Sequence, residues 1–369
     1  MPADHDSPAP ASSHPGRLPA LDGVRAIAVG LVVLFHTDYG QELMPGGAVG
    51  VDLFFILSGF LITLLLLRES QVRGRISIPG FYRRRILRIL PVFIVVLVCY
   101  IGAALVASSG AQQREMLSAA VRAGLYFSNL YAAAGHSLQV GIALAWSLAV
   151  EEQFYLVWPL LLTGLLLFGN RRAVMMGTLV IAVGSTLERV TLLAGGTPWY
   201  RLYYAPDIRA AELAAGACAA ALLVYHRESV AWLARHTDLL GLIAAGLLVA
   251  MSVFAAPQRS LLYTAGATLL IVAVPLFLTA SSLGEGSKSS RLLTTRPFRW
   301  IGLISYSLYF WSGEAFLLVH LHHGSLRRIE YTPLAILLGL LLASISYYVV
   351  ERPFLRLKDR GRREVKAAG

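Results

Sequence analysis

Ten apolar stretches dominate this sequence, and each is long enough to cross the roughly 30 Å hydrocarbon core of a bilayer. A backbone inside hydrocarbon must satisfy its own hydrogen bonds, so stretches of this length predict helices. Only 14% of the residues are charged and 56% are hydrophobic, whereas soluble domains carry about 25% charged residues. We therefore expect an all-α polytopic membrane protein, a bundle of about ten transmembrane helices. The expected spans lie near residues 24–40, 49–67, 89–108, 144–168, 173–192, 207–225, 238–255, 261–280, 300–320 and 332–350.

The organisation expected around these spans is simple. Residues 1–20 are rich in Pro, Ala and Ser and lack the pattern of a cleaved signal, so they are expected to form a disordered cytoplasmic tail. Residues 21–356 are expected to form one ten-span membrane domain, and residues 357–369 a basic cytoplasmic tail. The stretch 116–135 is apolar enough for an eleventh span. That span would move the basic C-terminal tail outside, so an interfacial or re-entrant helix is expected there.

Basic residues are distributed unevenly between the two sides of these spans. If both termini are cytoplasmic, 24 Lys and Arg residues lie on the cytoplasmic side and 6 on the opposite side. Basic residues are concentrated on the cytoplasmic side of membrane proteins, so this asymmetry predicts a multi-pass protein of the cell membrane with both termini inside. The net charge of +11 is then explained by topology, and the expected partner is the lipid bilayer rather than nucleic acid.

Two polar residues interrupt the first apolar stretch, Arg25 and His36. Eleven helical positions separate them, which returns the chain to nearly the same face about 16 Å further along. Arg25 alone is typical of a side chain that reaches the membrane surface. Together, the pair indicates that one face of this helix carries two functional positions.

Ionisable residues from six spans fall in the predicted outer half of the membrane. A charge placed centrally in a span costs about 2.5 to 3.5 kcal/mol, so charges scattered toward lipid are unfavourable. The pattern therefore predicts a polar chamber between the helices. Its expected members are His36, Asp52, Glu151, Glu152, Glu188, Arg189, Asp207, Arg209, Glu212 and Glu314.

A second basic group, Arg84, Arg85 and Arg88, lies at the cytoplasmic mouth of the third span. A lone cluster of this kind usually anchors a helix to anionic lipid head groups. With Arg25 on the same side, the cluster favours a receptor for a polyanion, because arginine presents a forked set of donors to phosphate. A phosphate site about 16 Å from a histidine suits a long, thin phosphorylated ligand, and an acyl-coenzyme A would fit.

Six motifs occur in a recognisable order along the sequence: LPALDGVRAIAVGLVVLFH, GVDLFFILSGFLIT, FYRRRILRILP, WSLAVEEQFYLVWP, SYSLYFW and VERPF. In these motifs and their spacing, the sequence resembles the acyltransferase 3 family of integral membrane acyltransferases over residues 18–356, nearly the whole chain. This resemblance implies transfer of an acyl group from cytoplasmic acyl-CoA to a hydroxyl, commonly of a sugar, glycan, lipid-linked carbohydrate or macrolide. By matching positions, Arg25, Arg84, Arg85 and Arg88 would serve the donor, with His36 and Glu152 at the reaction centre.

Acyl transfer to an alcohol needs a base for the hydroxyl proton and a donor for the oxyanion. We expect His36 to be the base and Glu152 to orient its ring, with an acetyl or short acyl group transferred directly from acyl-CoA. Helix packing is the alternative role for each candidate oxyanion donor. These are Ser147, Tyr155 and Tyr306. Asp52, Asp207, Arg209 and Glu314 are expected to line the chamber or bind the acceptor.

Neither a metal ion nor a cofactor is expected, and acyl-CoA would be a co-substrate. A ten-span transporter of an anion or a proton-coupled solute is the alternative function, because transporters also place ionisable residues near mid-membrane. No pair of Gly- or Pro-interrupted spans recurs in the two halves. A structural membrane protein would leave the buried histidine and carboxylates without a role.

Overall fold

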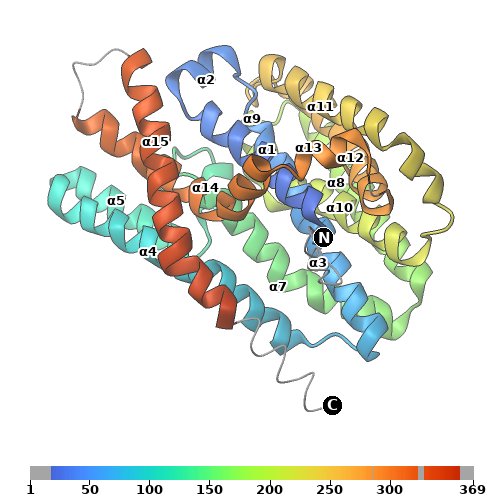
Figure 1. Ribbon diagram of the computed structural model, residues 1–369. Coiled ribbons are helices and arrows are strands. Elements are labelled where there is room, and N and C mark those ends of the chain that lie inside the picture. The colour runs from blue at the N-terminus through green and yellow to red at the C-terminus, as the bar shows by residue number, and fades with distance from the viewer. Residues whose placement is uncertain (1–17, 285, 323–327, 358–369) are drawn as a thin grey trace, which may run out of the picture.

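A computed structural model describes residues 18–284, 286–322 and 328–357, and throughout these ranges the chain forms helices joined by short connections (Figure 1). The long helices that contain the expected spans are α1 (Pro19–Phe35), α3 (Val49–Arg73), α4 (Ile78–Ala107), α7 (Ala145–Phe168), α8 (Arg171–Ala194), α10 (Pro206–Tyr225), α11 (Thr237–Phe254), α12 (Ser260–Leu283), α14 (Arg296–His322) and α15 (Arg328–Ser346). The short helices are α2 (Asp38–Leu43), α5 (Gly110–Gly124), α6 (Ser128–Ala133), α9 (Trp199–Tyr204), α13 (Lys288–Leu293), a 3₁₀ turn (Ala231–His236) and a π turn (Tyr347–Glu351).

The expected polytopic helical bundle is confirmed. In the described part of the chain, 8 helices are long and apolar enough to cross a membrane. The two remaining long helices are special: α1 has 17 residues, and α14 has 27 residues that include buried Ser307, Ser312 and Glu314. These two helices pack against each other. The short helix α1 and the polar-containing helix α14 therefore lie side by side in the bundle.

Small residues let the central helices approach closely. A Cβ added to Gly59 of α3 would lie 1.8 Å from the Leu213 carbonyl oxygen of α10. In the other direction, a Cβ on Gly216 of α10 would lie 2.0 Å from the Ile56 carbonyl oxygen of α3. Helices in membranes commonly pack closely through small residues. Lipid tails are as apolar as the helix surfaces, so the hydrophobic effect does not drive the helices together. The α3–α10 pair therefore forms a tightly packed centre.

Three local predictions need correction or refinement. The first span was expected to continue to residue 40, but α1 ends at Phe35, before the short helix α2. The stretch 68–88 was expected to be a loop, but it is mostly helical, and only residues 74–77 connect α3 to α4. The stretch 116–135 forms no span: it breaks between α5 and α6, where Tyr126 has a φ of 58°. The expected tails fall largely on residues 1–17 and 358–369, which lie outside the described residues.

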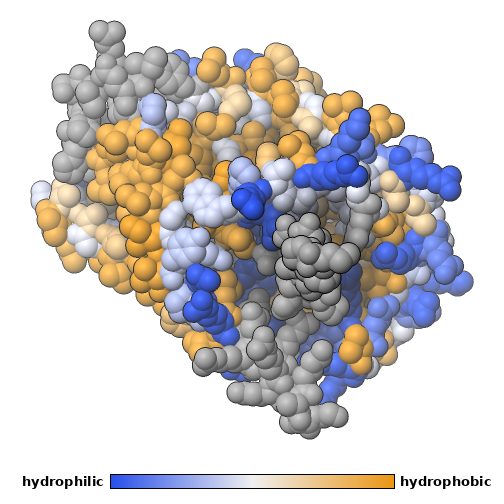
Figure 2. Space-filling model, in the orientation of Figure 1, coloured by the Kyte–Doolittle hydropathy of each residue, from blue (hydrophilic) through white to orange (hydrophobic). Residues whose placement is uncertain are grey.

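The outer surface carries apolar side chains along whole helices. Leu337, Leu341 and Ile345 of α15 are exposed by 63%, 57% and 51%, and the region over α15 appears apolar in Figure 2, whereas hydrophilic residues gather elsewhere on that face. In water, such a helix face would have to be buried. The distribution fits a bundle surrounded by lipid.

Candidate functional site

Helix α1 connects two cavities. One, the arginine cavity, has a volume of about 90 Å³ and is bounded by α1, α3, α4, α7 and α14. Arg25 of α1 contributes to it, together with Arg85 and Arg88 of α4. Three of the four arginines predicted to bind the donor therefore line one cavity. The other residues that line it include Phe54, Ser58, Ser147, Glu151, Tyr155, Tyr306 and Tyr309.

Within the arginine cavity, Glu151 organises the side chains of α3 and α7. Ser58 Oγ donates a hydrogen bond to Glu151 Oε1 over 2.7 Å, and the Tyr155 hydroxyl donates to Oε2 over 3.0 Å. The guanidinium of Arg85 lies 4.5 Å from the centre of the Tyr155 ring, within the range of a cation–π contact. The result is a partly compensated cationic cavity.

The four arginines predicted to hold phosphates fall into two groups. Arg25 lines the cavity and pairs with Asp22 over 3.2 Å, with 19% of its side chain exposed. Arg84 instead pairs with Glu69 of α3 over 2.8 Å and is not among the residues lining the arginine cavity. One helical position turns a side chain by about 100°, which explains why Arg84 and Arg85 diverge.

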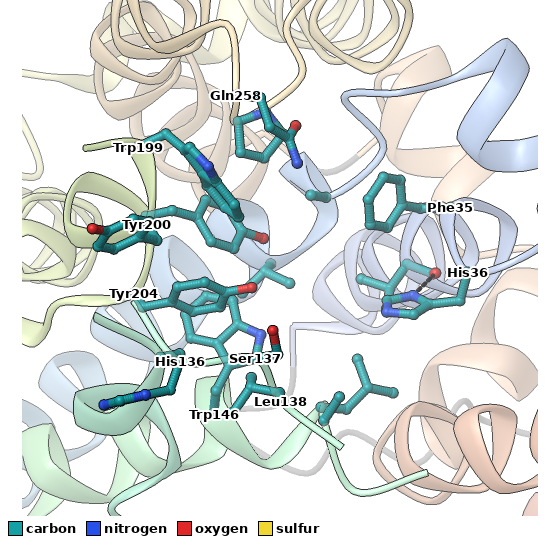
Figure 3. A pocket seen from close by; sticks show the side chains of 18 of the residues that line it. Phe35, His36, His136, Ser137, Leu138, Trp146, Trp199, Tyr200, Tyr204 and Gln258 are labelled. Carbon is teal, nitrogen blue, oxygen red and sulfur yellow. Dashed lines mark hydrogen bonds between the residues drawn. The ribbon is translucent and has the colours of Figure 1, made fainter. Parts of the chain in front are cut away.

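The second space, the histidine cavity, has a volume of about 370 Å³ and lies at the C-terminal end of α1. His36 forms one side, and aromatic residues form the opposite side (Figure 3). In this view Trp199 and Tyr204 lie across the cavity from His36, and the ring of His136 points away. Phe35 lies on the same side as His36, and the other aromatic residues that line the cavity are Trp146, Trp199, Tyr200, Tyr203 and Tyr204.

The orientation of His36 is set by its own helix. Its Nδ1 lies 2.7 Å from the Val32 carbonyl oxygen. A carbonyl accepts only, so this hydrogen bond requires the proton to be on Nδ1 when the ring is neutral. The lone pair of Nε2 is then available, which is the state that a general base requires.

A thin partition separates the two cavities. At the start of α7, Leu144 and Trp146 line the histidine cavity, whereas Ser147 and Leu148 line the arginine cavity. Ser147 Oγ and the Tyr309 hydroxyl are 2.5 Å apart, which joins α7 to α14 at this level. Ser147 Oγ also lies 3.2 Å from the Leu144 carbonyl oxygen. Each hydroxyl has a single proton, so while the two remain bonded to each other only one of them can donate to a ligand that crosses the partition.

Asp52 and Arg209, which were predicted to line the chamber, form a buried ion pair beside it. Arg209 Nη1 donates to Asp52 Oδ1 over 2.6 Å, and the Tyr263 hydroxyl bonds to both oxygens of Asp52 over 2.7 Å. Both charged side chains are 0% exposed. Arg209 also donates through Nε to the Tyr203 carbonyl over 2.5 Å and lies 4.4 Å from the centre of that ring. The ion pair therefore supports the aromatic side of the histidine cavity from behind.

Six other residues predicted for the chamber line neither cavity: Glu152, Glu188, Arg189, Asp207, Glu212 and Glu314. Asp207 forms an ion pair with Arg201 at the start of α10. Glu314 and Glu152 each keep a buried oxygen, Oε1, that has no hydrogen-bond partner within the described residues. The structure therefore does not bring Glu152 to His36.

Glu152 lies close enough to Tyr126, which is between α5 and α6, for its charge to act on the Tyr126 phenol. Burial raises the pKa of the Tyr126 phenol, and the negative charge of Glu152 raises it further. The next residue, Gln153, donates a hydrogen bond to the Tyr126 carbonyl over 3.0 Å and exchanges two more with Asn129. Consecutive residues of α7 thus serve different neighbours: Glu151 faces the arginine cavity, and Glu152 and Gln153 face the α5–α6 connection.

Several site residues were missed by sequence reasoning. The aromatic segment 199–204 was not identified, although its four aromatic residues in six positions were a visible signal. Ser58 and Tyr309 also escaped notice, because isolated hydroxyls in apolar helices usually bond to their own backbone. The buried ion pair between Arg189 and Glu212, 2.5 Å apart, joins two residues that were predicted separately.

Comparison with known proteins identifies the class of this chain. The acyltransferase domain family matches residues 18–350, so the chain belongs to the acyltransferase 3 family. It is 31% identical over 310 residues to the peptidoglycan O-acetyltransferase OatA of Listeria monocytogenes, covering 80% of this chain and 48% of that protein. It is also 29% identical over 352 residues to the O-acetyltransferase OatA of Staphylococcus aureus, covering 92% and 57%.

A third relative is the putative peptidoglycan O-acetyltransferase YrhL of Bacillus subtilis, 30% identical over 362 residues that cover 93% of this chain and 55% of that protein. The chain therefore spans about half the length of these relatives. No solved structure matches it. Family membership favours the acyltransferase prediction over the transporter alternative.

Proposed function

We propose that this protein is a membrane O-acetyltransferase that moves an acetyl group from acetyl-CoA to a hydroxyl of a glycan. The observation that carries the proposal is that one helix, α1, contributes Arg25 to the arginine cavity and His36 to the histidine cavity. The names of the relatives support an acetyl group and a glycan acceptor.

The arginine cavity suits the donor. Its cationic residues, Arg25, Arg85 and Arg88, match the negative charge of the nucleotide of coenzyme A. Its volume of about 90 Å³ is too small for a nucleotide or for a whole pantetheine arm, so only the thioester end of the arm would enter it. The phosphates would stay at the arginines that line its edge, and the thioester would reach toward the partition.

The proposed reaction takes place where the two cavities meet. The acceptor hydroxyl gives its proton to His36 Nε2 as its oxygen bonds to the thioester carbonyl carbon. One hydroxyl of the Ser147–Tyr309 pair would donate a hydrogen bond to the oxyanion that forms, while the other donates to its partner. When the carbon–sulfur bond breaks, the sulfur leaves as a thiolate and takes the proton from the imidazolium. The products are an O-acetyl ester and free coenzyme A, so no other reactant is needed.

In this proposal the Val32 carbonyl fixes the tautomer of His36. The carboxylate predicted to support the imidazolium, Glu152, would act without direct contact. Its contribution is open to a separate test, described below.

The central experiment is His36→Gln in the purified full-length protein, assayed for coenzyme A release and for acetylated glycan. Glutamine preserves much of the size and polarity of the side chain but cannot act as the base. We expect transfer to fall by about 100- to 10,000-fold, the usual contribution of a general base, with unchanged affinity for acetyl-CoA.

His236→Gln is the matched control, because His236 lies in the 3₁₀ turn and lines neither cavity. Activity within a few-fold of wild type in the His36 variant, at equal protein level, would contradict the assignment.

A further inference from the structure

We infer that the histidine cavity binds its acceptor as an uncharged sugar ring, stacked against the aromatic side opposite His36, and that it rejects sugars carrying a charge on that ring. This inference rests on the proposed function and adds the chemical class of acceptor. It is carried by the composition of the cavity, its geometry and the placement of the nearest charges.

The residues lining the cavity include no Asp, Glu, Lys or Arg side chain in the described part of the chain. Polarity is supplied by neutral groups instead, including the Ser137 hydroxyl and the Gln258 amide. Both are labelled in Figure 3, on segments separate from the aromatic residues. Its volume of about 370 Å³ falls within the range of about 300 to 1,000 Å³ typical of small-molecule sites.

The aromatic rings contact one another at steep angles, 89° between Trp146 and Tyr204 and 51° between Trp199 and Tyr204, so a ligand would meet the face of one ring and the edges of its neighbours. The ring centre of Trp146 lies 4.8 Å from that of Tyr204, and the ring centre of Trp199 lies 6.0 Å from that of Tyr204. A pyranose presents apolar C–H groups on its faces and hydroxyls around its rim. Such a ring can stack against indole and phenol faces while its hydroxyls bond to neutral donors and acceptors. In this position, a rim hydroxyl would point across the cavity to His36.

Apart from two histidines, His36 and His136, the described residues that line the cavity offer a charged sugar no counter-ion. The buried cation Arg209, which contacts the ring of Tyr203, is already paired with Asp52, so its charge is compensated. Moving an unpaired carboxylate, phosphate or ammonium group from water into such a cavity carries a large desolvation cost. The same cavity imposes no such cost on a hydroxyl or an acetamido group that finds a neutral partner.

The first test compares matched acceptors that share one ring. Acetyl-CoA and the full-length protein would be supplied with p-nitrophenyl β-D-glucoside, its glucuronide, its glucosaminide and its N-acetylglucosaminide. We expect acetylation of the two neutral glycosides with kcat/KM at least tenfold higher than for the carboxylate or the ammonium compound. Equal or higher kcat/KM for the charged pair would overturn the inference while leaving the acetyltransferase function in place. Failure to acetylate any glycan, simple or polymeric, would instead overturn the proposed function.

The second test is binding without chemistry. Trp199→Ala should weaken binding of the neutral glycoside, followed by tryptophan fluorescence, by at least tenfold, and Trp199→Phe should retain most of the affinity. Donor KM should not change in either variant. Trp232→Ala is the control, because Trp232 is 58% exposed in the 3₁₀ turn, outside the cavity. Equal glycoside affinity in wild type and Trp199→Ala would reject the stacking site, provided that thermal denaturation curves show both proteins to be folded.

Discussion

The arginine and histidine cavities share three helices, α1, α3 and α7, yet they offer opposite environments. The arginine cavity contains three guanidinium groups and one carboxylate, Glu151. The histidine cavity, over the residues that the structure describes, contains none of these charged types and is lined instead by aromatic rings. Helical spacing explains how neighbouring turns of the same helices create both environments, since Arg25 and His36 are about 16 Å apart along α1.

This difference shows how one bundle can hold two chemically unlike substrates. A charged ligand requires paired or compensated charge nearby, whereas a neutral ligand is best bound where charge has been removed. The partition formed by Trp146, Ser147 and Tyr309 separates the two environments. Variants that change only one cavity therefore test whether the two environments act separately.

The largest stability effect is expected behind the histidine cavity. Arg209→Met leaves Asp52 buried and unpaired, and loss of one partner from a buried pair typically costs about 3 to 5 kcal/mol. The variant should unfold at lower temperature in detergent, and any folded fraction should bind acceptor weakly, because Tyr203 loses its support. Arg201→Met is the comparison variant: its ion pair with Asp207 is partly exposed, and such pairs contribute about 0 to 1 kcal/mol. Equal loss of stability in both would contradict this view of the Arg209 network.

The next effect in size concerns the arginine cavity alone. Arg85→Ala removes a charged donor, and charge-assisted hydrogen bonds contribute about 1.5 to 3 kcal/mol, so the KM for acetyl-CoA should rise by about 10- to 150-fold. Arg85→Lys should recover only part of this loss, because lysine keeps the charge without the forked geometry. Acceptor KM should stay constant. If Arg85→Ala, Arg85→Lys and the wild-type protein bind acetyl-CoA equally in calorimetry, Arg85 does not contact the donor and only orients the helix in the membrane.

The fold could largely be predicted from the sequence, because apolar length determines which segments cross a membrane. Helix ends were less predictable: α1 stops at Phe35 although the apolar stretch continues, and the charged stretch 68–88 continues the helices α3 and α4. Charge density suggested a loop there. The pairing of Arg84 with Glu69 shows instead that the charges neutralise one another on helix surfaces.

Within the candidate site, residue type was easier to predict than residue orientation. Glu152 was predicted to orient His36, but Glu151 is the carboxylate that lines a cavity, because helical periodicity alone cannot determine which face of a helix meets a cavity. The aromatic side was missed for another reason. Its residues come from α7 and α9, about 50 positions apart, and such distant segments meet only through tertiary packing.

Replacing either of the neighbouring carboxylates Glu151 and Glu152 with glutamine should have a smaller effect on kcat/KM. Glu151→Gln should lower kcat/KM about tenfold, or roughly 1.4 kcal/mol, because Ser58 and Tyr155 donate to different carboxylate oxygens and glutamine replaces one of these acceptors with an NH2 donor. Glu152→Gln should have the milder effect on rate, since Glu152 contacts neither cavity. A larger loss in Glu152→Gln, together with a changed pH–rate profile, would restore the predicted His36–Glu152 pair.

The smallest effect is expected for Arg84, and it locates the end of the donor site. Arg84 pairs with Glu69 and does not line the cavity, so Arg84→Ala should change donor KM by no more than about threefold, the size of a partly exposed ion pair. Raising ionic strength should weaken acetyl-CoA binding in this variant as much as in wild type, because the contacts at Arg25, Arg85 and Arg88 remain. Glu69→Gln provides the complementary variant, since it frees Arg84 without removing it. Tighter acetyl-CoA binding in Glu69→Gln, together with a tenfold loss in Arg84→Ala, would show that Arg84 exchanges Glu69 for a phosphate of the donor. The cationic site would then extend beyond the arginine cavity to the surface between α3 and α4.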